Sequence, residues 1–256
     1  MRLLVATSVA TWAFQRVRWL GYRSYYRLVE TNYDHQWLST EKSTPAGRFR
    51  SYDLLNRHGG DEMLAEIHDA CGPEAVIYDI GANIGVYSLA LAADSPDRRL
   101  LAIEPAPQIR AQLQANVDCN DFGDRIEIMD CGVGNDDATQ KFYLSTYPEL
   151  SGFDRESATR WEASLAGTIS VPVRRVDTIV ESSPPPDAIK VDVEGASPAV
   201  LRGARETLIN YRPTLFIEVH EEGLSRETGA EVRELLAAVD YSVAERDDYW
   251  RCEPVE

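Results

Sequence analysis

The stretch VIYDIGANIGVYS, from Val76 to Ser88, decides the fold of this chain. It begins with a short, bounded apolar run that carries an aspartate near its end, which is typical of a buried parallel strand. Gly81 and Gly85 follow and open what the pattern predicts as a helix. Glycine allows a sharp turn and a close approach to a ligand, and the unpaired N–H groups at a helix start point toward that turn. The stretch therefore predicts a cradle for a nucleotide-like cofactor.

Two cofactor classes compete for this turn. A dinucleotide needs the pattern Gly-x-Gly-x-x-Gly, whose glycines make room for a pyrophosphate. Here Asn83 stands in place of the middle glycine and Gly85 follows Gly81 at a different spacing, so a pyrophosphate would fit poorly. S-adenosylmethionine has no phosphate. Its amino group needs a carboxylate such as Asp79, and its carboxylate needs the N–H groups of the turn. The plain alternative is a turn that uses glycine and asparagine for tight geometry alone.

A second acid strengthens the prediction of a cofactor site. The apolar run from Leu100 to Ile103 ends at Glu104, nineteen residues after Gly85, and Pro105 stops the strand. In a doubly wound sheet, the second strand lies beside the first and its terminal acid overhangs the same crevice. Glu104 is therefore expected to accept hydrogen bonds from two ribose hydroxyls.

The remaining sequence alternates between strand and helix patterns, which predicts an α/β fold with a doubly wound, mostly parallel sheet. Asp61 is a plausible N-cap for the second helix. Residues 139–144 and 168–173 predict an added β-hairpin, and residues 31–60 look polar and irregular. The chain is expected to divide into an N-terminal helical and irregular extension, 1–70, and a main domain, 71–256. Strands are expected at 76–80, 99–103, 125–130, 188–193 and 214–219, with a final strand or hairpin at 241–252. Helices are expected at 1–30, 62–70, 85–93, 107–119, 197–209 and 226–238.

A longer pattern extends beyond the two acids Asp79 and Glu104. It comprises Asp79 to Gly85, Glu104-Pro105, Asn116, Lys190 to Ala196, Val200 to Ala204 and Pro213 to His220. In these residues the chain resembles the FkbM-type family of S-adenosylmethionine-dependent methyltransferases. The resemblance implies a class I (Rossmann-like) methyltransferase fold with seven strands, S-adenosylmethionine as the cofactor and transfer of a methyl group to oxygen. Ser197 departs from the family pattern, which has an acid there, and the segment 130–137 matches only loosely. Together with the strand and turn above, the resemblance gives a cofactor site of Asp79, Gly81, Asn83, Gly85, Glu104 and Asp130.

Four further groups are expected at the same edge of the sheet. Asp192 and Glu194 end the fourth strand, and Glu218 and His220 end the fifth. Residues two apart on a strand point the same way, so each pair shares a face. Like charges this close raise one carboxyl pKa, which suits a general base, and imidazole titrates near neutral pH. Glu194 or His220 is therefore expected to take the acceptor's proton.

Lys190, two residues before Asp192, completes the predicted catalytic group by neutralising one of the acids. Two alternatives stay open. Asp192, Glu218 and His220 would make an oxygen and nitrogen site for a divalent metal that lowers the pKa of the hydroxyl. The sequence does not predict a metal, and this site stays only as an alternative. Glu194, which directly precedes a helix, would otherwise be a helix cap.

Composition limits the partners. Asp and Glu outnumber Lys and Arg by 42 to 26, and the net charge is −16. Only three of the basic residues are lysines. An acidic, lysine-poor surface is typical of a halophilic protein, because high salt screens its self-repulsion. Nucleic acid is not an expected partner, because binding it requires clusters of positive charge.

The four cysteines lack the spacing of a zinc site or a disulfide framework.

The N-terminus differs from the rest of the chain. Residues 1–29 contain five arginines and no acid, and the apolar stretch from Leu3 to Phe14 is too short to span a bilayer. A basic helix with interfacial aromatics would lie on an anionic membrane surface. The chain is therefore expected in the cytoplasm, with peripheral contact to the inner face of the membrane through residues 1–27. The alternative is a helix packed on the acidic body of the protein.

The acceptor is the least determined part. Aromatic residues in the loop 145–161 and near the N-terminus would stack on sugar faces, which favours a saccharide or another small or lipid-linked hydroxyl. A methyltransferase acting on bases is disfavoured, because Val191 to Gly195 stands where such enzymes carry Asn/Asp-Pro-Pro-aromatic. A non-catalytic module that binds S-adenosylmethionine is the third class. The oligomeric state has no signal in the sequence.

Overall fold

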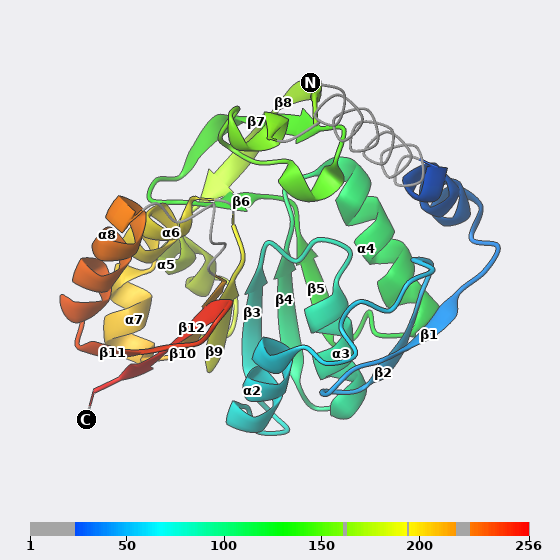
Figure 1. Ribbon diagram of the computed structural model, residues 1–256. Helices are drawn as coiled ribbons and strands as arrows, with labels where there is room; N and C mark the ends of the chain where they lie inside the picture. Colours follow the sequence, from blue (N-terminus) through cyan, green and yellow to red (C-terminus); the bar gives the residue numbers. More distant parts are fainter. Residues whose placement is uncertain (1–23, 161–162, 194, 219–225, 256) are drawn as a thin grey trace, which may run out of the picture.

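A seven-stranded, mostly parallel sheet forms the centre of the computed structural model, which describes residues 24–160, 163–193, 195–218 and 226–255 (Figure 1). The strand order is β11-β12-β10-β9-β3-β4-β5. All neighbours from β10 to β5 are parallel, and β12 runs antiparallel to β10 and β11. This confirms the predicted α/β fold. The strands are β3 Val76–Ile80, β4 Arg99–Ile103, β5 Ile126–Met129, β9 Ala188–Val191, β10 Thr214–Glu218, β11 Tyr241–Glu245 and β12 Tyr249–Pro254.

Helices cover both faces of the sheet. Successive residues of β3 point to opposite faces of the sheet, and both faces are buried. Ile77 belongs to the hydrophobic core on one face and Tyr78 to the core on the other. The core with Ile77 includes α2 to α4, and the core with Tyr78 includes α5 to α8. Short apolar strands without a polar face thus require helices on both sides. The helices are α2 Glu62–Ala70, α3 Val86–Asp94, α4 Pro107–Cys119, α5 Val176–Val180, α6 Ser197–Gly203, α7 Arg205–Tyr211 and α8 Arg226–Ala237.

The predicted helix at 197–209 is wrong in one respect, because it is two helices that meet at Ala204. The start of α7 is bound by a side chain from the unpredicted helix α5. Asp177 Oδ1 accepts hydrogen bonds from the backbone N–H and the hydroxyl of Thr207, both at 2.8 Å. A carboxylate on free N–H groups stabilises a new helix start, and nothing in the local pattern reports a partner thirty residues away.

The predicted hairpin is present but belongs to a three-stranded sheet. β7 Ala138–Ser145 and β8 Leu165–Arg174 pair antiparallel, and β6 Gly132–Val133 adds a parallel strand. This small sheet sits over the end of the central strands (Figure 1). Two 3-10 turns, η1 Pro148–Leu150 and η2 Ser157–Thr159, lie in the connection between β7 and β8, which the sequence left without structure.

The sequence predicts an irregular segment at 31–60, and this prediction is wrong for part of it. The structure has a second hairpin there, β1 Thr40–Ser43 and β2 Arg48–Ser51. In β2, Phe49 and Ser51 are buried while the two arginines are exposed. Phe49 joins the same core as Leu64 of α2 and Leu89 of α3. The predicted boundary at residue 70 therefore does not separate two cores.

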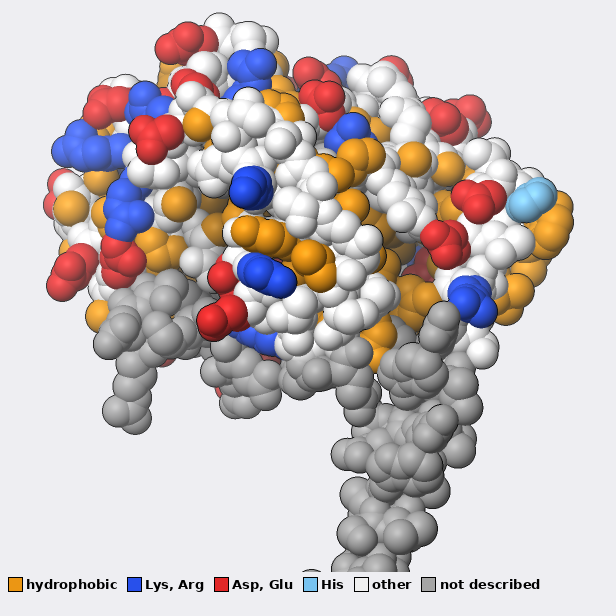
Figure 2. All heavy atoms as spheres, turned by 90° about the horizontal axis from the view of Figure 1, so that it is seen from above, with side chains coloured by type: hydrophobic (Ala, Val, Ile, Leu, Met, Phe, Trp, Pro, Cys, Tyr) orange, Lys and Arg blue, Asp and Glu red, His pale blue; other side chains and the backbone are white. Residues whose placement is uncertain are grey.

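Residues 24–35 are helical, which confirms residues 24–30 of the predicted N-terminal helix. The proposed membrane-binding segment 1–27 lies almost wholly outside the described residues and stays a prediction. Among the residues that the structure describes, no helix has the length and apolarity needed to cross a bilayer. On the face in Figure 2, basic side chains are scattered among acidic ones rather than gathered into a patch.

Asn116 of α4 ties the N-terminal extension to the main domain. Its buried amide donates to the Tyr33 hydroxyl and to the carbonyl of Ile84, both at 2.9 Å. Its Oδ1 accepts from the backbone N–H of Tyr52 at 3.1 Å. One side chain thus joins the first helix, the strand β2 region and the turn before α3.

Asn116→Ala is expected to lower the free energy of unfolding by about 2–3 kcal/mol, because it leaves buried backbone groups without partners. Urea denaturation measures this, with Gln114→Ala on the exposed side of the same helix as the control. Equal stability of the two variants would show that Asn116 does not join the extension to the domain.

Candidate active site

The turn after β3 is built around two glycines whose φ angles are +78° at Gly81 and +87° at Gly85. A Cβ on Gly81 would lie 1.9 Å from the carbonyl oxygen of Asp192, and a Cβ on Gly85 would lie 2.2 Å from Leu113 Cδ1. Both glycines therefore let the turn pack against β9 and α4. Asn83 also has a positive φ, +51°, which asparagine tolerates better than most residues.

Glu104 fixes this turn from the neighbouring strand. Its Oε2 accepts from the backbone N–H of Asn83 at 3.0 Å, and its Oε1 accepts from Ala106 N–H at 2.8 Å. Burial raises the pKa of Glu104 to about 7, and these two hydrogen bonds reduce the shift. The carboxylate still has unused lone pairs, and it lines a cavity at the edge of the sheet. It can therefore accept hydrogen bonds from a ligand in that cavity, and its contact with ribose hydroxyls stays a prediction.

Lys190 is a buried cation beneath the turn, with 3% of its side chain exposed. Its Nζ lies 3.1 Å from Asp79 Oδ1 and 3.3 Å from Asp192 Oδ2, and it donates to the carbonyl of Gly81 at 3.2 Å. Burial alone would lower the pKa of Lys190, but the carboxylates around it, Asp79 first, hold that pKa above its ordinary value. Lys190 therefore stays charged and neutralises two acids rather than the one expected. This network identifies it as a charge partner rather than a proton-transfer group.

The structure corrects the role predicted for Asp79. Its side chain is 2% exposed and belongs to the lining of neither cavity described here. Besides Lys190, it binds the hydroxyl of Ser88 at 2.7 Å. Asp79 is thus an internal counter-ion, and the expected direct contact with an amino group finds no support.

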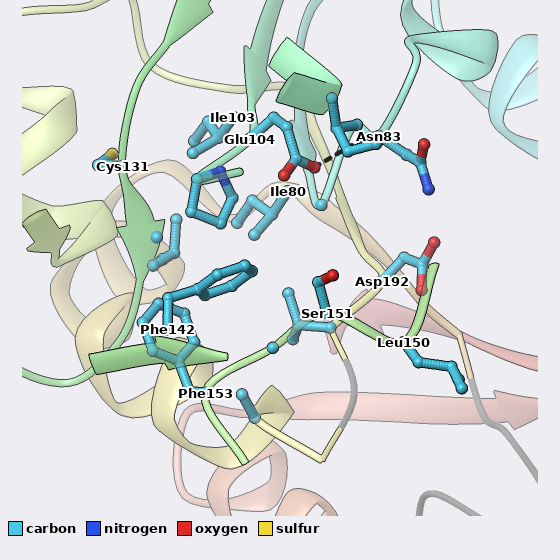
Figure 3. Close-up of a pocket in the computed structure, with 18 of the residues that line it drawn as sticks. Ile80, Asn83, Ile103, Glu104, Cys131, Phe142, Leu150, Ser151, Phe153 and Asp192 are labelled. Atoms are coloured by element: carbon cyan, nitrogen blue, oxygen red, sulfur yellow. Dashed lines mark hydrogen bonds between the residues drawn. The ribbon is translucent and has the colours of Figure 1, made fainter. Parts of the chain in front are cut away.

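A cavity of about 370 Å³ opens beside Glu104, at the carboxyl ends of β3, β4 and β9 (Figure 3). Its walls are mostly apolar, with few polar groups, as in sites for nucleoside-sized ligands. Glu104 and Asn83 lie on one side of it, and an aromatic pair lies on another. The labelled lining residues are Ile80, Asn83, Ile103, Glu104, Cys131, Phe142, Leu150, Ser151, Phe153 and Asp192.

The aromatic pair comes from the added sheet, where the sequence predicted no cofactor contact. Phe142 of β7 and Phe153 of the following connection meet edge to face, with ring centroids 5.1 Å apart. Phe153 also covers Gly132, since a Cβ there would lie 2.3 Å from its ring. Asp130, predicted to lie near the adenine, is exposed and lines neither cavity. Its neighbours Cys131 and Gly132 line the smaller cavity.

A second cavity, of about 670 Å³, adjoins the first. The two share Gly81, Asn83, Ile109, Pro148 and Asp192, so they meet at the turn after β3. The walls of the second cavity come from the N-terminal helix, the hairpin β1–β2, α4 and the connection between β7 and β8. They contain tyrosines, side-chain amides and hydroxyls: Tyr25, Tyr26, Tyr33, Tyr87, Asn56, Gln108, Gln112, Ser145, Thr146 and Ser164.

Of the predicted catalytic residues, Asp192 lies on the rim shared by both cavities. Glu218, of the alternative metal site, lines the smaller one. Glu194 and His220 lie outside the described residues, so their roles stay predictions. Among the residues that can be examined, no group of three or more His, Cys, Asp and Glu is placed to hold a metal ion. The metal alternative depends on His220 and is not tested.

Comparison with known proteins gives a consistent result. Residues 79–243 match the family model described as the methyltransferase FkbM domain. The AMB antimetabolite synthetase AmbE of Pseudomonas aeruginosa is 24% identical over 225 residues, which cover 73% of this chain and 10% of AmbE. The 2-O-methyltransferase NoeI of Sinorhizobium fredii is 30% identical over 155 residues, which cover 55% of this chain and 61% of NoeI.

A solved structure supports the fold. The crystal structure of the O-methyltransferase from Bacillus cereus in complex with SAH aligns with a TM-score of 0.50 at 15% identity, covering 79% of this chain and 82% of that one. At this identity the likeness shows the fold alone. The chain spans a tenth of the length of AmbE and less than two-thirds of NoeI.

Lys190→Met is expected to lower the free energy of unfolding by about 3–5 kcal/mol, because it leaves the Asp79 carboxylate buried without its cation. Chemical denaturation followed by circular dichroism measures the loss. Lys141→Met, at an exposed position of β7, is the control. Adding Asp79→Asn to Lys190→Met should recover part of the stability, and a double variant as unstable as the single one would contradict this account of the pair.

Proposed function

This chain belongs to the FkbM methyltransferase family, and we propose that it transfers the methyl group of S-adenosylmethionine to a hydroxyl of a saccharide or another small or lipid-linked acceptor. Two adjoining cavities support this proposal. The smaller one has the size and lining of a nucleoside site. The larger one carries many polar side chains among apolar ones and meets the smaller one at a shared rim.

The donor is assigned to the smaller cavity. Glu104 would accept hydrogen bonds from the two ribose hydroxyls, and the aromatic pair of Phe142 and Phe153 supplies an apolar wall suited to a base. The sulfonium end would then lie toward the rim, where Asp192 is found. A carboxylate there favours the positive charge of the donor by simple attraction.

Methyl transfer at this rim is an in-line displacement. The S–CH₃ bond breaks as the O–CH₃ bond forms, the sulfonium becomes a neutral thioether, and the hydroxyl loses its proton. The main task of the protein is to hold oxygen and methyl about 3–3.5 Å apart in line. Two cavities that share Gly81, Asn83 and Asp192 support such an arrangement.

The acceptor is assigned to the larger cavity. Tyrosines offer flat faces to a sugar ring, and amides and hydroxyls offer hydrogen bonds to its oxygens. Oxygen as the acceptor atom is further supported by the name of the relative NoeI, a 2-O-methyltransferase. A metal-assisted reaction and a non-catalytic donor-binding module are the alternatives that an assay separates.

The function is tested with purified full-length protein at multimolar KCl. Calorimetry with S-adenosylmethionine and S-adenosylhomocysteine is expected to show binding of both. Methyl transfer from labelled donor is then assayed with methyl glucoside, methyl mannoside and methyl fucoside, with and without EDTA. Binding without transfer to any glycoside contradicts the saccharide proposal, and loss of transfer in EDTA would establish the metal-assisted alternative.

Glu104→Gln is expected to weaken S-adenosylhomocysteine binding by about 10- to 100-fold, because hydrogen bonds to a charged group contribute about 1.5–3 kcal/mol each. The pH dependence gives a sharper readout. The pKa of Glu104 is about 7 in the free protein, and ribose hydroxyls favour the ionised carboxylate. Affinity in the native protein should therefore rise as pH increases from 6 to 8.

Glu104→Gln should remove this pH dependence, and the exposed Glu127→Ala on the neighbouring strand should retain it. Native affinity that stays flat between pH 6 and 8 would contradict the assignment of Glu104 to the ribose.

The raised pKa of Glu104 also affects the stability of the fold, in the opposite direction. Since ionisation is disfavoured in the folded state, the free protein should lose stability as pH rises from about 4.5 to 7.

A further inference from the structure

A histidine and an aspartate form a hydrogen-bonded pair in the wall of the larger cavity. His58 Nδ1 lies 2.8 Å from Asp61 Oδ2, and the side chains are 36% and 15% exposed. His58 lines the cavity, and Asp61 stands behind it as the N-cap of α2. Neither residue was among the sequence-predicted site residues, although Asp61 was predicted as the cap.

Besides His58, two groups donate hydrogen bonds to the Asp61 carboxylate. The Tyr87 hydroxyl donates to it at 2.9 Å, and the backbone N–H of Leu64 donates to Oδ1 at 2.9 Å. Burial and the charge of Asp61 raise the pKa of Tyr87 well above its ordinary value, so this phenol stays a donor. Burial alone would raise the pKa of Asp61, but the hydrogen bonds that it accepts outweigh burial and lower it. Asp61 is therefore an ionised, fixed acceptor.

An ionised carboxylate can only accept, so the proton of a neutral His58 must sit on Nδ1. Its Nε2 then carries the lone pair. In the part of the chain that the structure describes, no hydrogen bond engages that nitrogen. This is the arrangement in which a carboxylate orients an imidazole so that the other nitrogen accepts a proton.

A chain of contacts links this pair to the rim between the cavities. The rings of His58 and Tyr87 are 6.1 Å apart, and the Tyr87 ring is 4.8 Å from Lys190 Nζ. Lys190 in turn lies 3.3 Å from Asp192 on the rim. His58 and Asp192 line the same cavity, so an acceptor bound in it can contact both residues.

We propose that His58 is the general base that removes the proton from the acceptor hydroxyl, and that Asp61 and Tyr87 position it. This inference rests on the proposed function. As the O–CH₃ bond forms and the S–CH₃ bond breaks, the hydroxyl proton moves to His58 Nε2. The resulting imidazolium is stabilised by the Asp61 carboxylate and releases its proton to solvent before the next turnover.

Asp192 is less suited to this step. Its Oδ2 is paired with Lys190, and an opposite charge at that distance favours the carboxylate over its protonated form. Among the described residues, His58 contacts the carboxylate of Asp61 and the ring of Tyr87, and neither of these is a cation. His220 is the other histidine predicted as a base, so its variant is compared with that of His58 in the test.

The first test reads the tautomer by nitrogen NMR of the full-length protein and needs no acceptor. Neutral His58 is expected to carry its proton on Nδ1. Asp61→Asn keeps a good helix cap but turns an amide N–H₂ toward His58, so the proton should move to Nε2. A native His58 protonated on Nε2 would overturn the proposal whatever the enzyme methylates.

The second test compares turnover with the glycoside that the native protein methylates. His58→Ala should lower kcat by about 100- to 10,000-fold, the usual contribution of a general base, and imidazole in the buffer should restore part of it. Donor affinity and unfolding midpoint should not change. His68→Ala is the matched control, because His68 also pairs with aspartates, Asp69 and Asp94, but lines neither cavity.

Asp61→Asn should lower kcat by at least about tenfold and shift the acidic limb of its pH profile, which a purely structural cap would not do. The groups in contact with His58 in this profile are Asp61 and Tyr87, with Lys190 beyond the tyrosine. Full turnover in His58→Ala, or a loss confined to His220→Ala, would reject His58 as the base. Absence of turnover in the native protein instead contradicts the proposed function.

Discussion

The buried ion pair between Lys190 and Asp79 is the constraint on which the rest of the site depends. The two residues face each other in the parallel register of β9 and β3. From this position Lys190 also reaches the carbonyl of Gly81 and the carboxylate of Asp192. One cation thereby fixes the turn after β3 against the end of β9. Since both cavities open at that junction, their relative position follows from this interaction.

The central sheet and the added segments divide the site between them. The sheet supplies Glu104 and the turn, which any chain with this strand order would place at the carboxyl edge. The N-terminal helix, the hairpin β1–β2 and the connection between β7 and β8 supply most of the larger cavity. The added segments also reach the smaller cavity, because Phe142 of β7 and Phe153 of the following connection line it.

The charged groups of the site form two clusters, one around Lys190 and one around His58. Around Lys190, the cation offsets the carboxylates of Asp79 and Asp192, and both Lys190 and Asp79 are buried. Around His58, the imidazole is half exposed and meets only one carboxylate. A residue that must gain and lose a proton in each turnover needs this access to solvent. The two clusters differ in their pairing, because Asp192 is paired with the Lys190 cation whereas His58 is hydrogen-bonded to a carboxylate.

The sequence by itself determined the elements with strong local periodicity. It placed the strand at 76–80, the acid Glu104 after the second strand, Asp61 as a helix cap and the hairpin at 139–144 and 168–173. Each of these depends on residues within a few positions of one another. Hydrophobic period and capping chemistry are local, so they can be read along the chain.

Only the tertiary structure decided which of these residues face a cavity. Asp79 carried the pattern of a ligand-binding acid, but its partner Lys190 lies 111 residues further along the chain and turns it inward. Phe153 and His58 carried no recognisable motif and yet line the two cavities. Their roles arise from contacts between segments distant in sequence, and no local pattern encodes which distant group a side chain will meet.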